Sequence, residues 1–190
     1  MTVENETDLQ GLLTIGRIVG LTLQHMIERV EPGMTTAELD AMGAAFLEAH
    51  EARSAPILAY KFPGATCISI NDEAAHGIPG ERVIQPGDLV NVDVSAEKDG
   101  YWADTGASAA VGTAQPQHLE LLDATREAQR DAMAAAVAGR SLRTVARAVE
   151  RCARRRGFSI IGELCGHGIG RQLHEAPSVA SVVRHAERSL

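Results

Sequence analysis

Two aspartates on one predicted β-hairpin are the residues whose type and spacing most directly suggest chemistry. Residues 91–95 alternate polar and apolar side chains, as a half-buried strand does. Asp99 and Gly100 form a strong signal for a two-residue hairpin turn, and the aromatic residues that follow suit a return strand. This hairpin carries Asp93 on its first arm and Asp104 on its second.

The turn determines where the two carboxylates stand. With that turn, paired residues have numbers that sum to 199, so Asp93 faces Gly106 and Asp104 faces Ser95. The two acids are then diagonal neighbours on one face, with Cβ atoms roughly 7–8 Å apart or less. Carboxylates at that spacing can reach toward a shared cation, although acids on strands also commonly face water. The opposite, apolar face of the hairpin is expected to enter the core.

Three histidines in glycine-rich or strand-end settings could complete such a site. His167 has a glycine on each side, which permits a tight backbone turn and leaves the imidazole unobstructed. His174 follows seven residues later, and His76 precedes a Gly-Ile-Pro sequence. Residues 166–170 could also be a plain glycine turn without a ligand. His76 and His174, each taken alone, also fit a surface position. A dinucleotide loop is not favoured, because the spacing differs from G-x-G-x-x-G and no apolar helix follows.

The elements that must position these residues are a mixture of helices and strands. Apolar residues at spacings of three and four predict helices over residues 8–30, 37–50, 117–138 and 142–156. Strands are predicted over residues 56–60, 65–71 and 158–161, beside the hairpin, whose return strand should continue to residue 111. The expected helix caps are Thr7, Thr35 or Thr36, Ser141 and, at a C-terminus, Gly157.

The second half of the chain repeats the element order of the first. Each half has a long helix, a glycine, a Ser or Thr cap, a shorter helix and a strand. The tripeptides Gly33-Met34-Thr35 and Gly139-Arg140-Ser141 occupy matching places, 106 residues apart. This repeat predicts two related α/β halves. The second half is the shorter, because no hairpin follows its strand.

Composition narrows the range of functions. A chain of 190 residues can bury a real core, and its length corresponds to one domain or at most two small ones. The net charge of −7 argues against nucleic acid or an anionic membrane as a main partner. Arginines do cluster over residues 143–156, but at helical spacings that fit a solvated helix face.

The sequence also indicates a cellular setting. Three cysteines do not make a disulfide framework and fit a reducing compartment. The N-terminus is polar and acidic, unlike a signal or transit peptide. No apolar run approaches the roughly 18 residues that span a bilayer. We therefore expect a soluble cytoplasmic protein.

Several separate strings of residues, taken together, resemble type I methionine aminopeptidases. Their order and spacing match from about Thr7 to Val179. They are Cys67–Asn71, His76–Pro79, Gly87–Val94, Asp99-Gly100, Asp104-Thr105 and Gly166–Gly170, followed by His174-Glu175 and Pro177. The resemblance is specific, because all of these strings must agree at once.

The resemblance implies an α/β fold of the pita-bread type, in which two pseudo-symmetric halves surround a metal site. That expectation agrees with the internal repeat. A single aminopeptidase-like domain would then occupy residues 1–190, and it would lack the C-terminal strands of the second half.

The resemblance also implies roles for individual residues. Asp93 would chelate one metal ion, Asp104 would bridge two ions, and His167 would bind the other ion. His76 and His174 would hydrogen-bond the scissile peptide and its tetrahedral intermediate. The pocket for the substrate methionine would be lined by Tyr60, Phe62, Cys67 and Leu173.

The implied activity is removal of the initiator methionine from nascent proteins by a hydroxide shared between two divalent metal ions. Two ions about 3.5–4 Å apart can lower the pKa of a shared water toward neutrality. A carboxylate-rich ligand set with one imidazole suits Co²⁺, Mn²⁺, Fe²⁺ or Zn²⁺. The expected partners are the N-terminal methionine of nascent polypeptides and the ribosome. A monomer that binds neither nucleic acid nor a membrane is expected.

Family members have two further glutamate ligands well downstream of the second histidine motif, and this chain ends before them. Glu175 is not a metal ligand in the family pattern, and Glu187 lies in a tail that matches nothing. An incomplete ligand set should bind metal weakly, which leaves an alternative function. The chain could be a catalytically inert pita-bread domain that binds peptides or protein partners. A metal-dependent dipeptidase of the same fold is disfavoured by the Cys67 pocket and the short N-terminal region.

Overall fold

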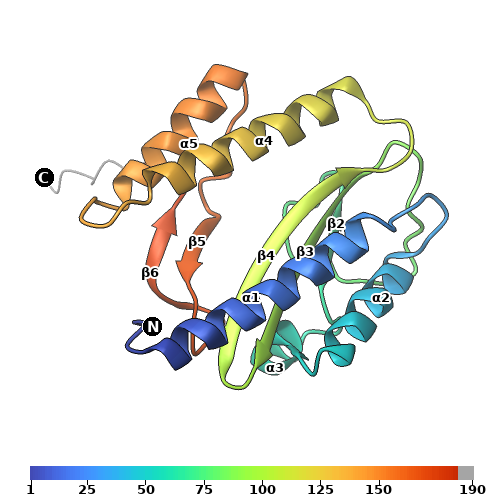
Figure 1. Cartoon of the computed structure of the whole chain (residues 1–190). Coiled ribbons are helices and arrows are strands. Elements are labelled where there is room, and N and C mark those ends of the chain that lie inside the picture. Colours follow the sequence, from blue (N-terminus) through green and yellow to red (C-terminus); the bar gives the residue numbers. More distant parts are fainter. Residues whose placement is uncertain (184–190) are drawn as a thin grey trace, which may run out of the picture. The chain divides into compact units, whose positions relative to one another are not determined.

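The computed structural model describes residues 1–183; His185 and Glu187 lie outside the described residues (Figure 1). The elements are α1 (Glu6–Ile27), α2 (Thr36–Ala49), β1 (Arg53–Ser54), α3 (Ala55–Tyr60), β2 (Cys67–Ile70), β3 (Leu89–Lys98), β4 (Tyr101–Ala110), α4 (Pro116–Ala135), α5 (Arg143–Arg156), β5 (Cys165–Gly168) and β6 (Glu175–Ala180). They form two compact units. The first contains residues 1–118 and 169–175, and the second contains residues 119–168 and 176–183.

Strand β3 is the centre of the sheet in the first unit. Strand β4 pairs with it antiparallel along its whole length, from Leu89 opposite Ala110 to Lys98 opposite Tyr101. A strand has only two edges, so β1 and β2 share the other edge of β3, one after the other. Strand β1 pairs near Glu97, and β2 pairs with the part of β3 that contains the first aspartate.

The predicted register of the hairpin is confirmed. Asp93 lies opposite Gly106 and Asp104 lies opposite Ser95. At the turn, Asp99 and Gly100 have φ angles of 53° and 81°. Positive φ at both central residues is what a type I′ hairpin turn requires, and Asn, Asp and Gly tolerate it best. Turn chemistry and side-chain alternation therefore fix the same register.

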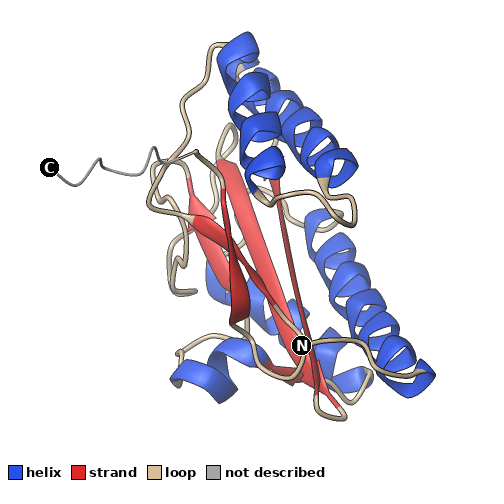
Figure 2. Cartoon of the chain, turned by 90° about the vertical axis from the view of Figure 1, so that its left-hand side faces the viewer, coloured by secondary structure: helices blue, strands red, loops and turns tan. Residues whose placement is uncertain are grey.

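The core lies on one face of this sheet, beneath α1 and α2. Figure 2 shows α1 running along one side of the strands, and α2 packs beside α1. Alternate residues of β3 point into this core because successive side chains on a strand face opposite ways. The fully buried residues include Val90, Val92, Val94 and Ala96 of β3, Ile15, Val19 and Met26 of α1, Leu39 and Leu47 of α2, and Ile68 and Ile70 of β2.

The N-terminal helices agree with the sequence prediction apart from one cap. Helix α1 is capped by Asn5, not by Thr7, since the Asn5 side chain accepts a hydrogen bond from the backbone N–H of Asp8. Helix α2 begins with a complete capping box between Thr35 and Glu38. Such reciprocal bonds satisfy backbone donors that have no partner within the helix.

The predicted strand over residues 56–60 is wrong, because this segment is helix α3. The side chain of Ser54 caps the helix by accepting from the backbone N–H of Ile57. Pro56 sits in the first turn, where its fixed φ suits a helix and its missing N–H costs nothing. Lys61 ends the helix in the left-handed conformation. Local capping thus overrides the β propensity of the apolar side chains.

The second unit consists of helices α4 and α5 and a small sheet in which β5 pairs with β6. Cys152 of α5 is buried, and its thiol donates to the backbone oxygen of Ala124 in α4 at 3.6 Å. Arg155 of α5 forms exposed ion pairs with Glu127 and Asp131 of α4. The buried contact and the ion pairs hold the two helices together.

Two expectations for this unit are corrected. Leu142, not Ser141, is the N-cap of α5, and it makes no side-chain cap bond. Residues 158–161 form no strand. The backbone N–H of Phe158 instead donates to Ala153 at 2.9 Å and closes the end of α5 after Gly157, the predicted C-cap. A backbone donor used in this way is not available to a strand ladder.

Candidate metal centre

The two aspartates of the hairpin lie on the face of the sheet opposite the core. Asp93 is half-buried on β3, with Cys67 of β2 opposite it on one side and Gly106 of β4 on the other. Asp104 is exposed on β4. Burial, the charge of Asp104 and a hydrogen bond between the two carboxyl groups together raise the pKa of Asp93 to about 7. Like charges at close range cannot both ionise easily, so the pair holds one proton.

The carboxylate pair fits a divalent cation. Carboxylate oxygens are ligands that hard and borderline divalent ions accept. A cation between Asp93 and Asp104 would take the place of the proton that the pair holds below about pH 7. Within residues 1–183, no group of three or more His, Cys, Asp or Glu side chains gathers closely enough to hold a metal ion. The pair is therefore the part of the predicted ligand set that the structure brings together.

Cys67 contributes an apolar wall to this face and not a ligand. Its side chain is buried in β2. Burial first, and then the charges of Asp93, Asp104 and Asp40, raise the pKa of its thiol to about 12. A thiol that stays protonated is neither a nucleophile nor a thiolate ligand. It behaves as a small, polarisable apolar group.

His76 is held against β2 by the residue that follows it. The carbonyl oxygen of Gly77 accepts from the backbone N–H of Ile68 at 2.9 Å, and its N–H donates to Ser69 Oγ at 3.0 Å. A Cβ at position 77 would lie 2.1 Å from the Ile68 carbonyl oxygen, so this approach requires glycine. His76 itself has a φ of 56°, a conformation that costs energy for a residue with a Cβ.

His174 meets Tyr60, a partner that the sequence alone does not pair with it. The Tyr60 hydroxyl lies 2.7 Å from His174 Nδ1, and the ring centroids are 5.9 Å apart. Tyr60 is exposed at the end of α3, Phe62 is half-buried, and Leu173 is buried. These three residues were predicted to line a methionine pocket, and that role stays a prediction.

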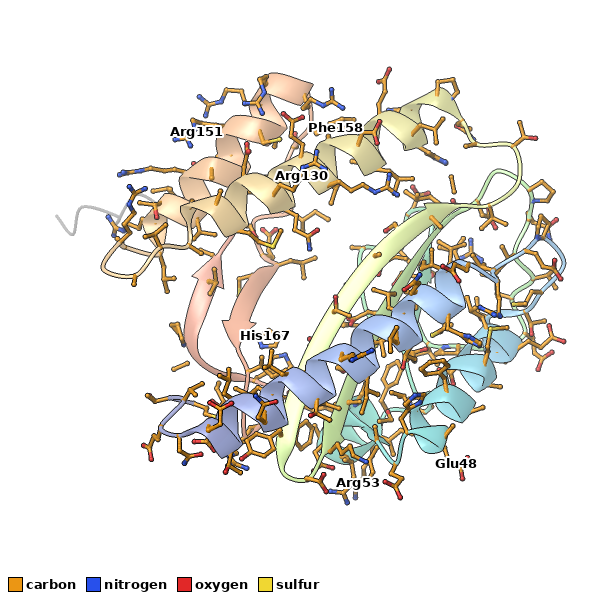
Figure 3. All side chains as sticks on the ribbon, viewed as in Figure 1. Glu48, Arg53, Arg130, Arg151, Phe158 and His167 are labelled. Atoms are coloured by element: carbon orange, nitrogen blue, oxygen red, sulfur yellow. The ribbon has the colours of Figure 1, made fainter. Side chains whose placement is uncertain are left out.

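His167 belongs to the second unit, in strand β5 (Figure 3). It is half-buried, and its Nδ1 lies 3.0 Å from the carbonyl oxygen of Gly168. A proton on Nδ1 would donate to that oxygen and direct Nε2 toward a ligand role, which is how many metal-binding histidines are oriented. Its assignment as a metal ligand stays a prediction.

Two further groups of residues join elements that carry predicted site residues, and no sequence motif marks these groups. Asp40 of α2 accepts from the backbone N–H groups of Ala65 and Thr66 and from Thr66 Oγ, at 2.7 to 3.0 Å. These bonds tie α2 to the segment that leads into β2. The second group joins Asp8, Tyr101 and Arg171. Neither group follows a local spacing that periodicity could reveal.

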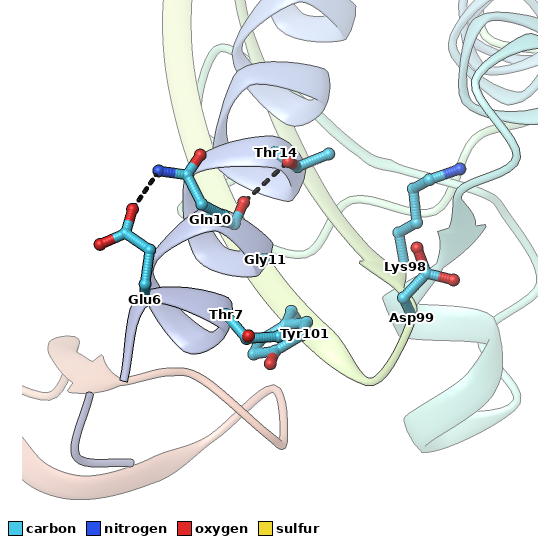
Figure 4. A pocket seen from close by; sticks show the side chains of 8 residues that line it. All are labelled: Glu6, Thr7, Gln10, Gly11, Thr14, Lys98, Asp99 and Tyr101. Atoms are coloured by element: carbon cyan, nitrogen blue, oxygen red, sulfur yellow. Dashed lines mark hydrogen bonds between the residues drawn. The ribbon is translucent and has the colours of Figure 1, made fainter. Parts of the chain in front are cut away.

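A cavity of about 400 Å³ lies apart from the predicted site residues, at the start of α1 and the tip of the hairpin (Figure 4). It is lined by Glu6, Thr7, Gln10, Gly11, Thr14, Lys98, Asp99 and Tyr101. Lys98 is already engaged, because its ammonium group donates to the His50 carbonyl and pairs with Glu51.

None of the helices within residues 1–183 is long and apolar enough to cross a membrane.

Comparison with known protein sequences identifies a family. The model of a family described as metallopeptidase family M24 matches residues 10–190. Methionine aminopeptidase 2 of Bacillus subtilis (strain 168) is 47% identical over 179 residues. The matched region covers 94% of this chain and 72% of that protein.

Solved structures agree with the sequence comparison. The crystal structure of methionine aminopeptidase from Rickettsia prowazekii superposes with a TM-score of 0.92 at 31% identity. That of methionine aminopeptidase from Thermotoga maritima has the same TM-score at 26% identity. Each match covers 98% of this chain and 75% of the other chain. The α/β pita-bread fold expected from the sequence is therefore confirmed.

Proposed function

Because the chain belongs to metallopeptidase family M24, we propose that it removes the N-terminal methionine from polypeptides in a metal-dependent reaction. The observation that carries this proposal is the carboxylate pair of Asp93 and Asp104, which lies on the hairpin face opposite the core and in which the pKa of Asp93 is raised to about 7. The 47% identity to methionine aminopeptidase 2 of Bacillus subtilis supports the same substrate class. It also supports a hydrolase.

Asp93, Asp104 and His167 are the residues that would hold the metal. We propose two divalent ions, with Co²⁺, Mn²⁺, Fe²⁺ and Zn²⁺ all compatible with oxygen and imidazole donors. When bound, such ions supply Lewis acidity, which polarises a carbonyl group and lowers the pKa of a water molecule. The pKa of Asp93, raised to about 7, implies that metal loading becomes easier as the pair loses its proton.

The histidines would act on the scissile peptide. When the Tyr60 hydroxyl donates to Nδ1 of neutral His174, the imidazole proton resides on Nε2. That N–H can donate to a peptide carbonyl oxygen as negative charge develops on it. His76, held beside β2, is proposed to contact the same peptide. Both roles require only hydrogen-bond donation from neutral imidazole.

The pocket residues suit a thioether. Cys67 stays a neutral thiol, and Leu173 is buried. With Phe62 and Tyr60 they would offer soft, polarisable and aromatic surface, to which a methionine side chain binds favourably. We propose nascent polypeptides in the cytoplasm as the substrates, a ribosome contact that brings them close, and a monomeric enzyme with one functional domain.

The experiment that tests this function is methionine release from a Met-Ala-Ser peptide, measured with millimolar Mn²⁺ or Co²⁺. We expect release by the wild-type chain and a loss of roughly 10³-fold in the Asp104→Ala variant, because one of the carboxylates that would hold the metal is removed. Glu81→Ala removes an exposed acid and is the matched control, which should stay at the wild-type rate. Peptide binding without any release would support the inert binding domain instead.

A further inference from the structure

A compact cluster of three side chains joins the segment of residues 169–175 to helix α1 and to the hairpin. Asp8, a residue only 7% exposed, accepts through its carboxylate from the Tyr101 hydroxyl at 3.0 Å and from Arg171 Nη2 at 2.8 Å. The Arg171 guanidinium also donates to the Tyr101 hydroxyl at 2.9 Å and to the Gly100 carbonyl at 3.3 Å. It stacks on the Tyr101 ring, 3.8 Å from the centroid.

The Tyr101 ring beneath Arg171 is closely packed. The Tyr101 ring is buried and lies directly against Gly11 of α1, where a Cβ would come within 2.3 Å of the ring. A hydrogen bond from the backbone N–H of Glu4, with those from Tyr101 and Arg171, holds the pKa of Asp8 below its usual value. The carboxylate therefore stays ionised and keeps its attraction for the guanidinium.

The rest of the segment is tied on both sides of His174. The Gly170 carbonyl accepts from the backbone N–H of Trp102 in β4 at 2.9 Å. The Glu175 carboxylate accepts from the backbone N–H groups of Arg171 and Gln172, at 2.7 and 2.9 Å. The segment between them carries buried Leu173 and the imidazole that meets Tyr60.

We propose that Arg171 is a positioning residue: bound by Asp8 and Tyr101, it fixes the 169–175 segment so that His174 Nδ1 meets the Tyr60 hydroxyl. The consequence for catalysis rests on the proposed aminopeptidase function. A planar guanidinium can stack on an aromatic ring and donate to several oxygens at once, whereas a lysine ammonium cannot do both. Misplacement of a reacting group by about 1 Å can cost roughly 100-fold in rate.

The test compares the full chain with three variants. Arg171→Met removes every bond of the guanidinium, and Arg171→Lys keeps only the charge. Arg151→Met is the matched control, because this exposed arginine projects from α5 in the second unit (Figure 3). The measurements are hydrogen exchange at the Trp102 and Gln172 amides and long-range ¹H–¹⁵N spectra that report the tautomer of His174.

We expect Arg171→Met to lose at least roughly 10-fold of the amide protection, because the local structure opens more often. The His174 spectrum should change from one dominant tautomer to a mixture, with a smaller change in Arg171→Lys and none in Arg151→Met. A folded Arg171→Met protein with wild-type amide protection and a wild-type His174 spectrum would overturn the proposal. If that variant does not fold, Tyr101→Phe removes one hydroxyl and keeps the ring, and the same signals decide the matter.

The kinetic constants provide a second measurement, which a purely structural role of Arg171 would leave unchanged. The folded Arg171→Met variant should show kcat lowered roughly 10- to 100-fold and KM within about 2-fold of wild type, since His174 would act mainly in the transition state. A wild-type kcat alongside a disturbed His174 spectrum would contradict the positioning role. If the wild-type chain releases no methionine, the proposed function fails, and the His174 spectrum still decides whether Arg171 positions the imidazole.

Discussion

The two faces of strand β3 differ sharply, although their residues alternate along ten consecutive positions. On one face, Val90, Val92 and Val94 are fully buried beneath α1 and α2. On the other, Asn91 and Asp93 are only half-buried and carry polar atoms. Burial on the first face stabilises the strand, while two adjacent acids on the second face oppose folding. One face of the strand therefore stabilises the fold, and the other carries the candidate site residue.

The covered face makes a costly polar arrangement on the other face tolerable. The covered face fixes the register, since a slip of one residue would turn every valine toward solvent. With the register fixed, Asp93 and Asp104 cannot move apart to relieve their repulsion, and they share a proton instead. A carboxylate pair held in this way would be preorganised for a cation. Substitutions on each face test this difference.

The largest effect on stability should come from the covered face. Val92→Ala removes two buried methyl groups, and we expect it to lower the free energy of unfolding by about 2–3 kcal/mol. Val83→Ala is the matched control, because Val83 is 41% exposed, and it should change stability by less than about 0.5 kcal/mol. Urea denaturation measures both. Equal losses in the two variants would show that the valine face is not a core.

The next effect concerns the close approach of α1 to the hairpin. Gly11→Ala places a Cβ 2.3 Å from the Tyr101 ring, and such overpacking should cost about 1–3 kcal/mol. Gly20→Ala, in the same helix with no atom within 4 Å of the new Cβ, should instead stabilise by roughly 0.5–1 kcal/mol, because alanine favours helix. Thermal denaturation compares the two. A stabilising Gly11→Ala substitution would show that the helix is not pressed against Tyr101.

The smallest effect belongs to the polar face and depends on pH. The pKa of Asp93 is raised to about 7 in the folded chain from its ordinary value of 3.8. Stability from its retained proton is complete below pH 3.8 and is lost progressively as the pH rises toward 7. Asn mimics the protonated acid and can donate to Asp104. In metal-free buffer, Asp93→Asn should therefore be more stable than wild type at pH 8, by on the order of 1 kcal/mol.

The pH dependence separates this effect from ordinary substitution effects. Below pH 4 the Asp93→Asn and wild-type proteins should have similar stability, because both then carry a neutral donor at this position. The comparison needs denaturation curves in the presence of a chelator at several pH values. A stability difference that is the same at pH 4 and pH 8 would contradict a proton shared between Asp93 and Asp104.

The hairpin and its acid pair could be predicted from the sequence because their determinants are local. The Asp99-Gly100 turn and the alternation beside it specify every pairing between β3 and β4. The secondary structure of residues 56–60 could not be predicted in the same way. Their apolar and aromatic side chains favour a strand, and the helix depends on one hydroxyl, that of Ser54, capping the next turn.

The contacts that hold His174 could not be predicted, for a different physical reason. Arg171 and Asp8 are 163 positions apart in the sequence, and Tyr60 and His174 are 114 apart. No periodicity or turn signal relates residues so distant, because the fold alone brings them together. Similarity to methionine aminopeptidases suggests a role for His174, whereas its hydrogen bond to Tyr60 emerges only in the structure.

The claim that Asp93 and Asp104 form a cation site can be tested by calorimetric titration with Mn²⁺. Titrations near pH 6 in two buffers of different ionisation enthalpy report both affinity and proton release. We expect Mn²⁺ binding by the wild-type chain with release of about one proton, because the pair is protonated at that pH. Asp104→Asn should weaken binding by roughly 100-fold or more. Unchanged affinity in Asp104→Asn, or binding without proton release, would contradict the claim.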